Sequence, residues 1–300
     1  MSFTSEVKNE VSKLKFTKAE DIAELSALII TTAEINDSIK VTTENASSAR
    51  KIFYTLKEVF DINAKITVRK GFNFQKKYLY ILEINKNVDK ILDTLGIKKG
   101  TLQDYIVADD ETMRAYLRGV FLGCGSINDP KKSRYHLEFL LQDKTYAEMI
   151  SKILNNYNLG SKVLKRENRY MVYIKGAEKI SDFLRLISAT NALLYYEDIR
   201  IYRDHKNMTN RLNNCEQANV DKIILSANEQ VVEIQKLIDN DMFDLLDEKD
   251  KVIATYRLKY PESSLQELSE IIALETPTKL TKSGIYHRLR KIKEMATKIK

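Results

Sequence analysis

The sequence has few residues of the kinds that hold metal ions or form disulfides. Its 300 residues include two cysteines and three histidines. Cys124 and Cys215 show no metal-type spacing, so we expect free thiols in a reducing cytoplasm and no zinc site. No apolar run reaches the length that spans a bilayer, and the polar N-terminus does not resemble a signal peptide. These absences predict a cytoplasmic protein that does not enter a membrane.

Two common catalytic arrangements are also missing. The glycine-containing stretch 116–127 lacks the lysine and the Ser or Thr of a phosphate-binding loop. The three histidines carry no local signature of nucleophilic catalysis. We therefore expect no catalytic residue, no metal, no cofactor and no small-molecule substrate.

An internal repeat dominates the first two thirds of the chain. Residues 116–127 are apolar but contain three glycines, each of which costs about 1 kcal/mol in a helix interior, so another helix is expected to pack closely there. Leu25–Ala33 is a similar stretch. After each, a strand, an amphipathic helix, two strands and a closing helix are expected. In the first half these lie at 35–43, 47–60, 64–70 with 77–84, and 88–95, and in the second at 135–141, 144–157, 162–166 with 170–175, and 177–187.

The two apolar stretches resemble the nine-residue LAGLIDADG helix of homing endonucleases. Leu25–Ala33 and Leu117–Gly125 overlay that motif without gaps. In those enzymes the paired helices lie at the centre of two αββαββα halves. The resemblance implies an α+β fold with a duplicated αββαββα LAGLIDADG-like domain, and we expect its central helices to touch through Ala27 and Gly119.

The catalytic positions of that motif are altered. The eighth position of each nuclease motif is an acidic metal ligand, and here Thr32 and Cys124 stand there. Neither side chain replaces a carboxylate around Mg²⁺. We therefore predict a non-catalytic scaffold. The alternative is a metal site completed by Glu34 or Asp129.

The outer strands of the duplicated domain carry basic residues. In the nucleases the corresponding strands form a saddle over DNA, so these residues are a candidate secondary surface for DNA or a partner. An equally good explanation is that any half-exposed antiparallel sheet shows lysines to water. The residues are Lys65, Arg69, Lys162, Lys165, Arg166 and Arg169.

Composition divides the chain further. We expect the duplicated domain at 1–205, with halves at about 1–100 and 108–205, and an Asn-rich polar connector at 206–219, whose asparagines would cap turns. An all-α domain follows at 220–300. The net charge is +7, and residues 276–300 hold eight Lys or Arg and one acid, whereas 220–275 hold thirteen acids and six basic residues. A basic helix on an acidic support is typical of a DNA-binding domain.

A helix–turn–helix is predicted at about 264–297. Ser264 and Glu267 form a capping box that opens a short helix, and a second helix follows at 282–300 with a turn between them. We expect Arg290 to reach base edges and Lys293 to contact phosphate. The alternative is an amphipathic helix with a solvated basic face. The candidate DNA-binding residues are Lys282, Ser283, Tyr286, His287, Arg288, Arg290, Lys291 and Lys293.

The two domains in this order resemble the WhiA family of bacterial regulators. Its sharpest matches are the runs Arg114–Ser126, Asn210–Asn219 and Thr281–Ile292, and the resemblance covers nearly the whole chain. It implies a nucleoid-associated protein of the cytoplasm that binds double-stranded DNA, with RNA polymerase or another regulator as a further partner. The implied processes are transcription, cell division, chromosome segregation or sporulation. Where Tyr286 stands the family usually has Asn, which can read adenine bidentately, whereas Tyr cannot.

Two other function classes remain open. One is a metal-dependent endonuclease, against which Thr32 and Cys124 argue. The other is a protein-interaction adaptor of the division machinery that binds DNA weakly, with the acidic segment 220–275 as its docking face.

Overall fold

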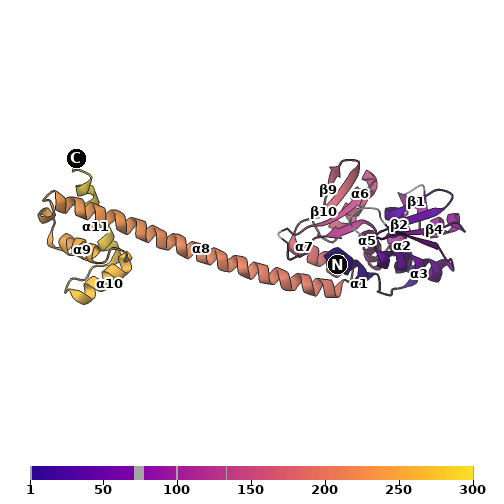
Figure 1. Ribbon diagram of the computed structural model, residues 1–300, viewed down its shortest axis with the longest axis horizontal. Helices are drawn as coiled ribbons and strands as arrows, with labels where there is room; N and C mark the ends of the chain where they lie inside the picture. The colour runs from indigo at the N-terminus through magenta and orange to yellow at the C-terminus, as the bar shows by residue number, and fades with distance from the viewer. Residues whose placement is uncertain (1, 71–77, 99–100, 133, 300) are drawn as a thin grey trace. The chain divides into compact units, whose positions relative to one another are not determined.

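The chain forms two compact units. The computed structural model describes residues 2–70, 78–98, 101–132 and 134–299. The units are Met1–Arg203 and Asp204–Lys300, and the boundary between them falls within helix α8 (Thr190–Asp239). All strands of the described residues belong to the first unit (Figure 1).

The first unit contains two halves with the same order of elements. The first half comprises α2 (Lys18–Thr32), β1 (Ala33–Ile35), β2 (Ile39–Thr43), α3 (Ala46–Phe60), β3 (Lys65–Lys70), β4 (Tyr78–Ile84) and α4 (Val88–Thr94). The second comprises α5 (Asp110–Cys124), β7 (Gly125–Ile127), β8 (Leu137–Leu141), α6 (Lys144–Asn156), β9 (Lys162–Arg166), β10 (Arg169–Ile174) and α7 (Ala177–Leu186). Helix α1 (Phe3–Val11) precedes them, and β5 (Ile97–Lys98), β6 (Thr101–Leu102) and the 3₁₀ helix η1 (Asp104–Val107) connect them.

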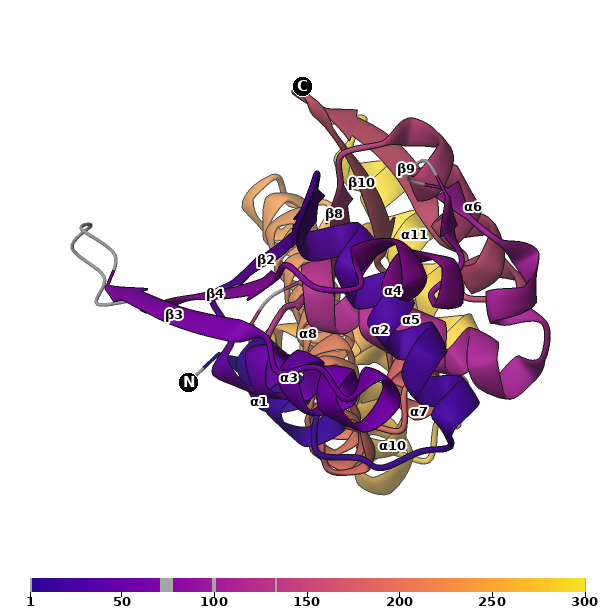
Figure 2. The ribbon, with the colours of Figure 1, turned by 90° about the vertical axis from the view of Figure 1, so that its right-hand side faces the viewer.

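The two halves also share one sheet topology. The strand orders are β1-β2-β4-β3 and β7-β8-β10-β9, and every neighbouring pair is antiparallel. Figure 2 shows α2 beside α5, with the two sheets on either side of this helix pair. The predicted α+β fold with a duplicated αββαββα domain is confirmed.

The helices α2 and α5 pack at short range because Gly119 has no side chain. A Cβ atom at Gly119 would lie 2.8 Å from the Cβ of Ala27 and even closer to the carbonyl oxygen of Glu24. Real Cβ atoms do not approach other atoms so closely, so any larger residue would push the helices apart. The expected contact through Ala27 and Gly119 is confirmed.

The strands differ from the sequence prediction where each central helix ends. Residues 35–43 were expected to form one strand, but they belong to a hairpin in which β1 pairs with β2. Asn36 donates its backbone N–H to the carbonyl of Ser38 at 3.0 Å across the turn. Residues of the Asn, Asp and Ser type favour such turns. In the second half, β7 pairs in the same way with β8, which begins at Leu137 and not at Tyr135.

The second unit is helical and has its own core. After α8 come η2 (Phe243–Leu245), α9 (Glu248–Lys259), α10 (Leu265–Glu275) and α11 (Lys282–Ala296). Its core contains Ile234, Leu237, Ile253, Leu268, Ile272, Ile285, Leu289 and Ile292. The apolar period predicted for the last helix therefore corresponds to its buried side.

The polar segment 206–219 is helical, whereas the sequence suggested turns capped by asparagines. All of it lies within α8, with its side chains exposed. Thr209 donates its hydroxyl to the carbonyl of His205 at 3.0 Å, a bond within the helix. Asparagine is only a weak helix breaker, and the whole of α8 contains no Gly or Pro to interrupt it.

Candidate nucleic-acid interface

Helix α11 begins at a well-defined cap and is held by its apolar side. Thr281 is the N-cap residue, and its hydroxyl accepts the backbone N–H of Gly284 at 3.2 Å. The preceding α10 opens with the predicted capping box of Ser264 and Glu267. The side of α11 that packs against α9 and α10 carries Ile285, Leu289, Ile292 and Ala296, all buried. This packing leaves the opposite side of α11 to solvent.

The exposed side of α11 is polar and basic. It carries five of the eight predicted DNA-binding residues: Lys282, Ser283, Tyr286, His287 and Arg290. Tyr286 is 53% exposed, and its ring lies 5.7 Å from that of His287 in an edge-to-face arrangement. We call these five residues the exposed face of α11. Four of them lie in the first half of the helix, and two of these, Lys282 and Ser283, lie in its first turn, where the helix N-terminus favours anions.

Arg290 has one acidic neighbour on its own helix. Its Nε lies 3.2 Å from a carboxylate oxygen of Glu294, one turn further along, and both side chains are exposed. Exposed pairs of this spacing contribute little to stability. Arg290 can therefore exchange this partner for another acceptor at little cost.

Arg288 and Lys291 are engaged within the unit. Arg288 lies 2.6 Å and Lys291 2.8 Å from the carboxylate oxygens of Asp250, which is fully buried. Both also contact Asp247, the N-cap residue of α9. The backbone N–H of Asp250, together with Lys291 and Arg288, lowers the pKa of Asp247 to about 2. These pairs hold α11 against the start of α9.

Lys293 is paired in a similar way with α8. Its ammonium lies 3.1 Å from Glu233 and 3.3 Å from Glu229. The hydrogen bonds to these two carboxylates raise the pKa of Lys293. Lys293 therefore already has two acidic partners at the position where the sequence suggested a phosphate contact. The acidic support was predicted from the charge pattern, but the two pairs of Lys293 were not, because each joins residues at least sixty positions apart.

The basic residues of the outer strands do not all share one side of the sheet. In the ladder of β9 and β10, Lys162 lies opposite Tyr173 and Arg166 opposite Arg169. Side chains alternate along a strand, so Lys165 points to the other side from Lys162 and Arg166. Lys165 therefore does not share a side of the sheet with Lys162 and Arg166, so these basic residues do not form one continuous face.

In the first half, the basic residues of β3 share their sheet with an acid of the neighbouring strand β4. Lys65 and Arg69 share one side of β3, as expected from their spacing. Lys65 lies directly opposite Glu83, which in turn lies opposite Lys40 on β2. Acids and bases therefore alternate across this side of the sheet, which weakens its attraction for a polyanion.

The two altered motif positions lie at the ends of the central helices. The Thr32 hydroxyl donates to the carbonyl of Leu28 at 2.6 Å, and the Cys124 thiol donates to that of Val120 at 3.4 Å. Both groups thus bond to their own helices. Burial raises the pKa of Cys124 to about 12, so the thiol is neutral.

A depression of about 640 Å³ adjoins these positions. Thr32 and Cys124 line it together with the carboxylates of Glu34 and Asp143, while Asp129 lines a different cleft. Asp143 was not singled out from the sequence; it accepts the backbone N–H of Tyr146 at 2.7 Å as the N-cap of α6. Across the described ranges, no three His, Cys, Asp or Glu side chains are grouped as metal ligands would be. None of the described helices combines the length and apolar character needed to cross a membrane.

Comparison with known proteins gives matches along almost the whole chain. The family model described as the WhiA N-terminal LAGLIDADG-like domain matches residues 18–98. The WhiA LAGLIDADG-like domain matches residues 113–206, and the WhiA C-terminal HTH domain matches residues 209–296. A "Probable cell division protein WhiA" of Staphylococcus aureus (strain JH9) is 42% identical over 311 residues, which cover 100% of this chain and 98% of that protein.

Solved structures share the fold. The structure of "full-length DUF199/WhiA from Thermatoga maritima" is similar with a TM-score of 0.61 at 24% identity, covering 99% of both chains. That of "the N-terminal LAGLIDADG domain of DUF199/WhiA" has a TM-score of 0.50 at 22% identity, covering 62% of this chain and 92% of that one.

Proposed function

Because the chain belongs to the WhiA family, we propose that it is a DNA-binding regulator that acts in cell division. The observation that carries this proposal is the exposed face of α11 in a helix–turn–helix unit. Two features support it: the face is polar and basic, and four acids of the same unit, Glu229, Glu233, Asp247 and Asp250, are paired with other residues of α11. A duplex of high negative charge is the partner that this chemistry fits best.

In the proposed complex, α11 lies in the major groove of double-stranded DNA. Lys282 and Ser283, at the start of the helix, contact phosphate oxygens, which fixes the register of the protein on the duplex. Tyr286, His287 and Arg290 lie along the same side and face the bases. An arginine can bond both acceptors of guanine, so Arg290 contributes most to sequence preference.

Arg288, Lys291 and Lys293 have a supporting role in this proposal. Their partners Asp250, Asp247, Glu233 and Glu229 belong to α9 and α8. By holding α11 in one orientation, these ion pairs preorganise the exposed face and reduce the cost of binding. The sequence had assigned all eight residues to DNA contact, and the proposal now keeps five.

We further propose that the first unit is a non-catalytic scaffold. The hydroxyl of Thr32 and the neutral thiol of Cys124 bond to their own helices and supply no carboxylate for Mg²⁺. The basic residues of β3, β9 and β10 are a secondary surface for DNA or a partner such as RNA polymerase or another regulator. We propose that the protein acts in the cytoplasm in association with the nucleoid. Its proposed role is in transcription, chromosome segregation or sporulation.

The adaptor hypothesis receives less support. It assigned the acidic segment 220–275 to a docking face for another protein. Four of these acids are paired with α11, which reduces the free negative charge of that surface. Because these acids are already bound to α11, we favour a DNA-binding domain in which α8 and α9 stabilise α11.

The test is binding of the whole chain to genomic DNA in solution, followed by genome-wide crosslinking in cells. We expect measurable affinity that falls steeply with salt, since each phosphate contact releases counterions. Crosslinking should recover discrete sites. Absence of affinity at low salt, with crosslinks spread at background level, would sink the proposal in favour of the adaptor.

A further inference from the structure

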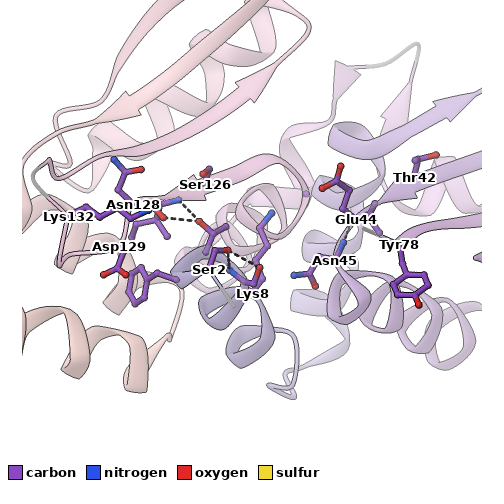
Figure 3. Close-up of a pocket in the computed structure, with 16 residues that line it drawn as sticks. Ser2, Lys8, Thr42, Glu44, Asn45, Tyr78, Ser126, Asn128, Asp129 and Lys132 are labelled. Carbon is purple, nitrogen blue, oxygen red and sulfur yellow. Dashed lines mark hydrogen bonds between the residues drawn. The ribbon is translucent and has the colours of Figure 1, made fainter. Parts of the chain in front are cut away.

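A polar cleft of about 960 Å³ lies in the first unit, beside helix α1 (Figure 3). One wall comes from the first half, at the end of β2, and the other from the second half, at β7 and the residues that follow it. Neither the helix–turn–helix nor the altered motif positions Thr32 and Cys124 belong to it. Its volume is within the range of cavities that bind small molecules.

Lys8 of α1 projects into this cleft. Lys8 is only 9% exposed, and its ammonium lies 5.7 Å from the centre of the Phe121 ring. Figure 3 shows the side chain rising between Ser126 on one wall and Glu44 on the other. Within the described residues, this ammonium has no hydrogen bond and no ion pair. A lysine so deeply buried is almost always paired.

The surroundings of Lys8 leave its charge uncompensated. Burial lowers the pKa of Lys8 to about 8, the change expected when an ammonium loses water without gaining a counter-charge. Cys124 is the group that most opposes this shift, but its own pKa is raised to about 12, so it carries no charge to offer. An anion bound in the cleft would supply the negative charge that the protein does not place beside the Lys8 ammonium.

The rest of the lining suits a polar ligand. The N-terminus of α1, capped by Ser2, borders the cleft and presents the positive end of the helix dipole. Side-chain hydroxyls and amides of Thr42, Asn45, Ser126 and Asn128 line the walls, and the other charged residues of the lining are Lys132, Glu44 and Asp129. Such groups can bond the hydroxyls and ring nitrogens of a compact metabolite.

We propose that this cleft binds a small phosphorylated metabolite, up to the size of a nucleoside monophosphate, with its phosphate against the Lys8 ammonium. A phosphate suits both features of the site, the buried cation and the helix N-terminus. Duplex DNA does not fit, because Lys8 is almost fully enclosed and a duplex is far wider than the cleft. The ligand is not a substrate, so the proposal agrees with a non-catalytic domain and is independent of DNA binding by α11.

The experiment is isothermal titration of the full chain with inorganic phosphate and with AMP at constant ionic strength, and with adenosine as the uncharged control. The variant Lys8→Met removes the charge and keeps an unbranched side chain that is only one atom shorter. Lys15→Met is the matched control, since Lys15 is exposed and lies outside the cleft. We expect binding of phosphate and AMP to the wild type and to Lys15→Met, and at least about tenfold weaker binding to Lys8→Met.

A second measurement covers the case in which Lys8→Met does not fold. Reductive methylation of the wild-type chain, read by peptide mass spectrometry, should be slowed by AMP at Lys8 and not at Lys15. No binding of phosphate or AMP to the wild type, or unchanged binding to Lys8→Met, would overturn the proposal. If Lys8→Met instead loses affinity for duplex DNA, and the wild type binds neither inorganic phosphate nor AMP, the anion is a DNA phosphate and the metabolite is excluded.

Discussion

At the scale of single residues, Glu24 and Arg118 form an ion pair in the seam between α2 and α5. Arg118 Nε lies 2.5 Å from Glu24 Oε2, and both side chains are buried. The guanidinium also lies over the ring of Phe16, 3.5 Å from its centre. Lys51 approaches the same carboxylate at 3.6 Å. A charge enclosed in this way depends on its partner.

Removal of one partner should therefore be costly. We expect Glu24→Leu to lower the free energy of unfolding by about 3–5 kcal/mol, since it leaves Arg118 buried without a counter-charge. The double variant Glu24→Leu with Arg118→Leu should recover most of this loss, because neither charge is then buried. Urea denaturation followed by circular dichroism measures both. A double variant as unstable as the sum of the two single variants would contradict this view.

Asp247 links the stability of the second unit to pH. In the folded state the pKa of Asp247 is about 2, mainly because its carboxylate accepts the backbone N–H of Asp250. The pKa of an unfolded aspartate is about 3.9. A lowered pKa stabilises the fold above the unfolded value, and this contribution is lost as pH falls from about 4 to about 2. Asp247→Asn keeps the N-cap but removes the charge. The variant should therefore lose less thermal stability than the wild type over this range.

The matched control for this measurement is Asp244→Asn. Asp244 lies in the same segment and its side chain is 96% exposed. We expect its melting temperature to follow that of the wild type between pH 4 and 2. An Asp247→Asn curve parallel to the wild type would show that the charge of Asp247 does not stabilise the unit.

None of these residue pairs was predicted from the sequence, for a physical reason. Arg118 lies within the glycine-containing stretch that was recognised as a packing seam, but its partner lies 94 positions earlier. The same holds for Lys291 and Asp247, 44 positions apart. Periodicity tells which side of a helix is buried, but not which acid of another helix faces a given base. The charge bias of 276–300 indicated a support of opposite sign without identifying the pairs.

At the scale of secondary-structure elements, the contact between α2 and α5 can be tested at a single glycine. At Gly119 even a methyl group would collide with backbone and side-chain atoms of α2. We expect Gly119→Ala to destabilise the fold by about 1–3 kcal/mol through overpacking, against its gain in helix propensity. Chemical denaturation measures the change.

Gly284→Ala is the control for helix propensity. Gly284 also lies in a helix, but the nearest atom to an added Cβ is the Thr281 hydroxyl at 3.4 Å, an ordinary contact. This variant should be neutral or stabilised by up to about 1 kcal/mol. If both variants behaved alike, the close approach of α2 and α5 would not be a determinant of stability.

Most elements were predictable because their local signals agree. Glycines in an apolar stretch required a close partner helix, and Gly119 and Gly123 do lie in α5, whereas Gly125 begins β7. The Ser264 capping box correctly marked the start of α10. The hairpin of β1 and β2 was missed because its turn is short and its first strand has only three residues. The helical form of 206–219 was missed because the many asparagines outweighed the absence of Gly and Pro from α8.

At the scale of the whole molecule, the account requires that the first unit performs no hydrolysis. We expect no nicking of supercoiled plasmid by the purified chain with Mg²⁺ or Mn²⁺, since Thr32 and Cys124 replace the metal-binding acids. Gel electrophoresis of the plasmid is the measurement. Nicking that disappears in Glu34→Ala or Asp143→Ala would instead identify the depression beside these residues as an active site.

Resemblance predicted the whole molecule better than local patterns could. Long matching runs such as Arg114–Ser126 and Thr281–Ile292 indicated both units in the correct order. A long run of this kind identifies a domain even where the boundaries of single strands are uncertain from the sequence. The cleft around Lys8 could not be predicted this way. It depends on four separate segments that only the folded chain brings together.

The central claim is that DNA is read by the exposed face of α11. Its most direct test is the affinity of Arg290→Ala and Lys293→Ala, measured by fluorescence anisotropy on a site selected from genomic DNA and on scrambled DNA, over a salt series. We predict that Arg290→Ala loses about 1–3 kcal/mol on the selected site and little on scrambled DNA, since a base contact is lost. Lys293→Ala, whose cation is already paired with Glu233 and Glu229, should change neither affinity nor salt slope appreciably. Equal weakening of both DNAs by Arg290→Ala would reduce that residue to a phosphate contact, and no effect of Arg290→Ala on either DNA would contradict the account.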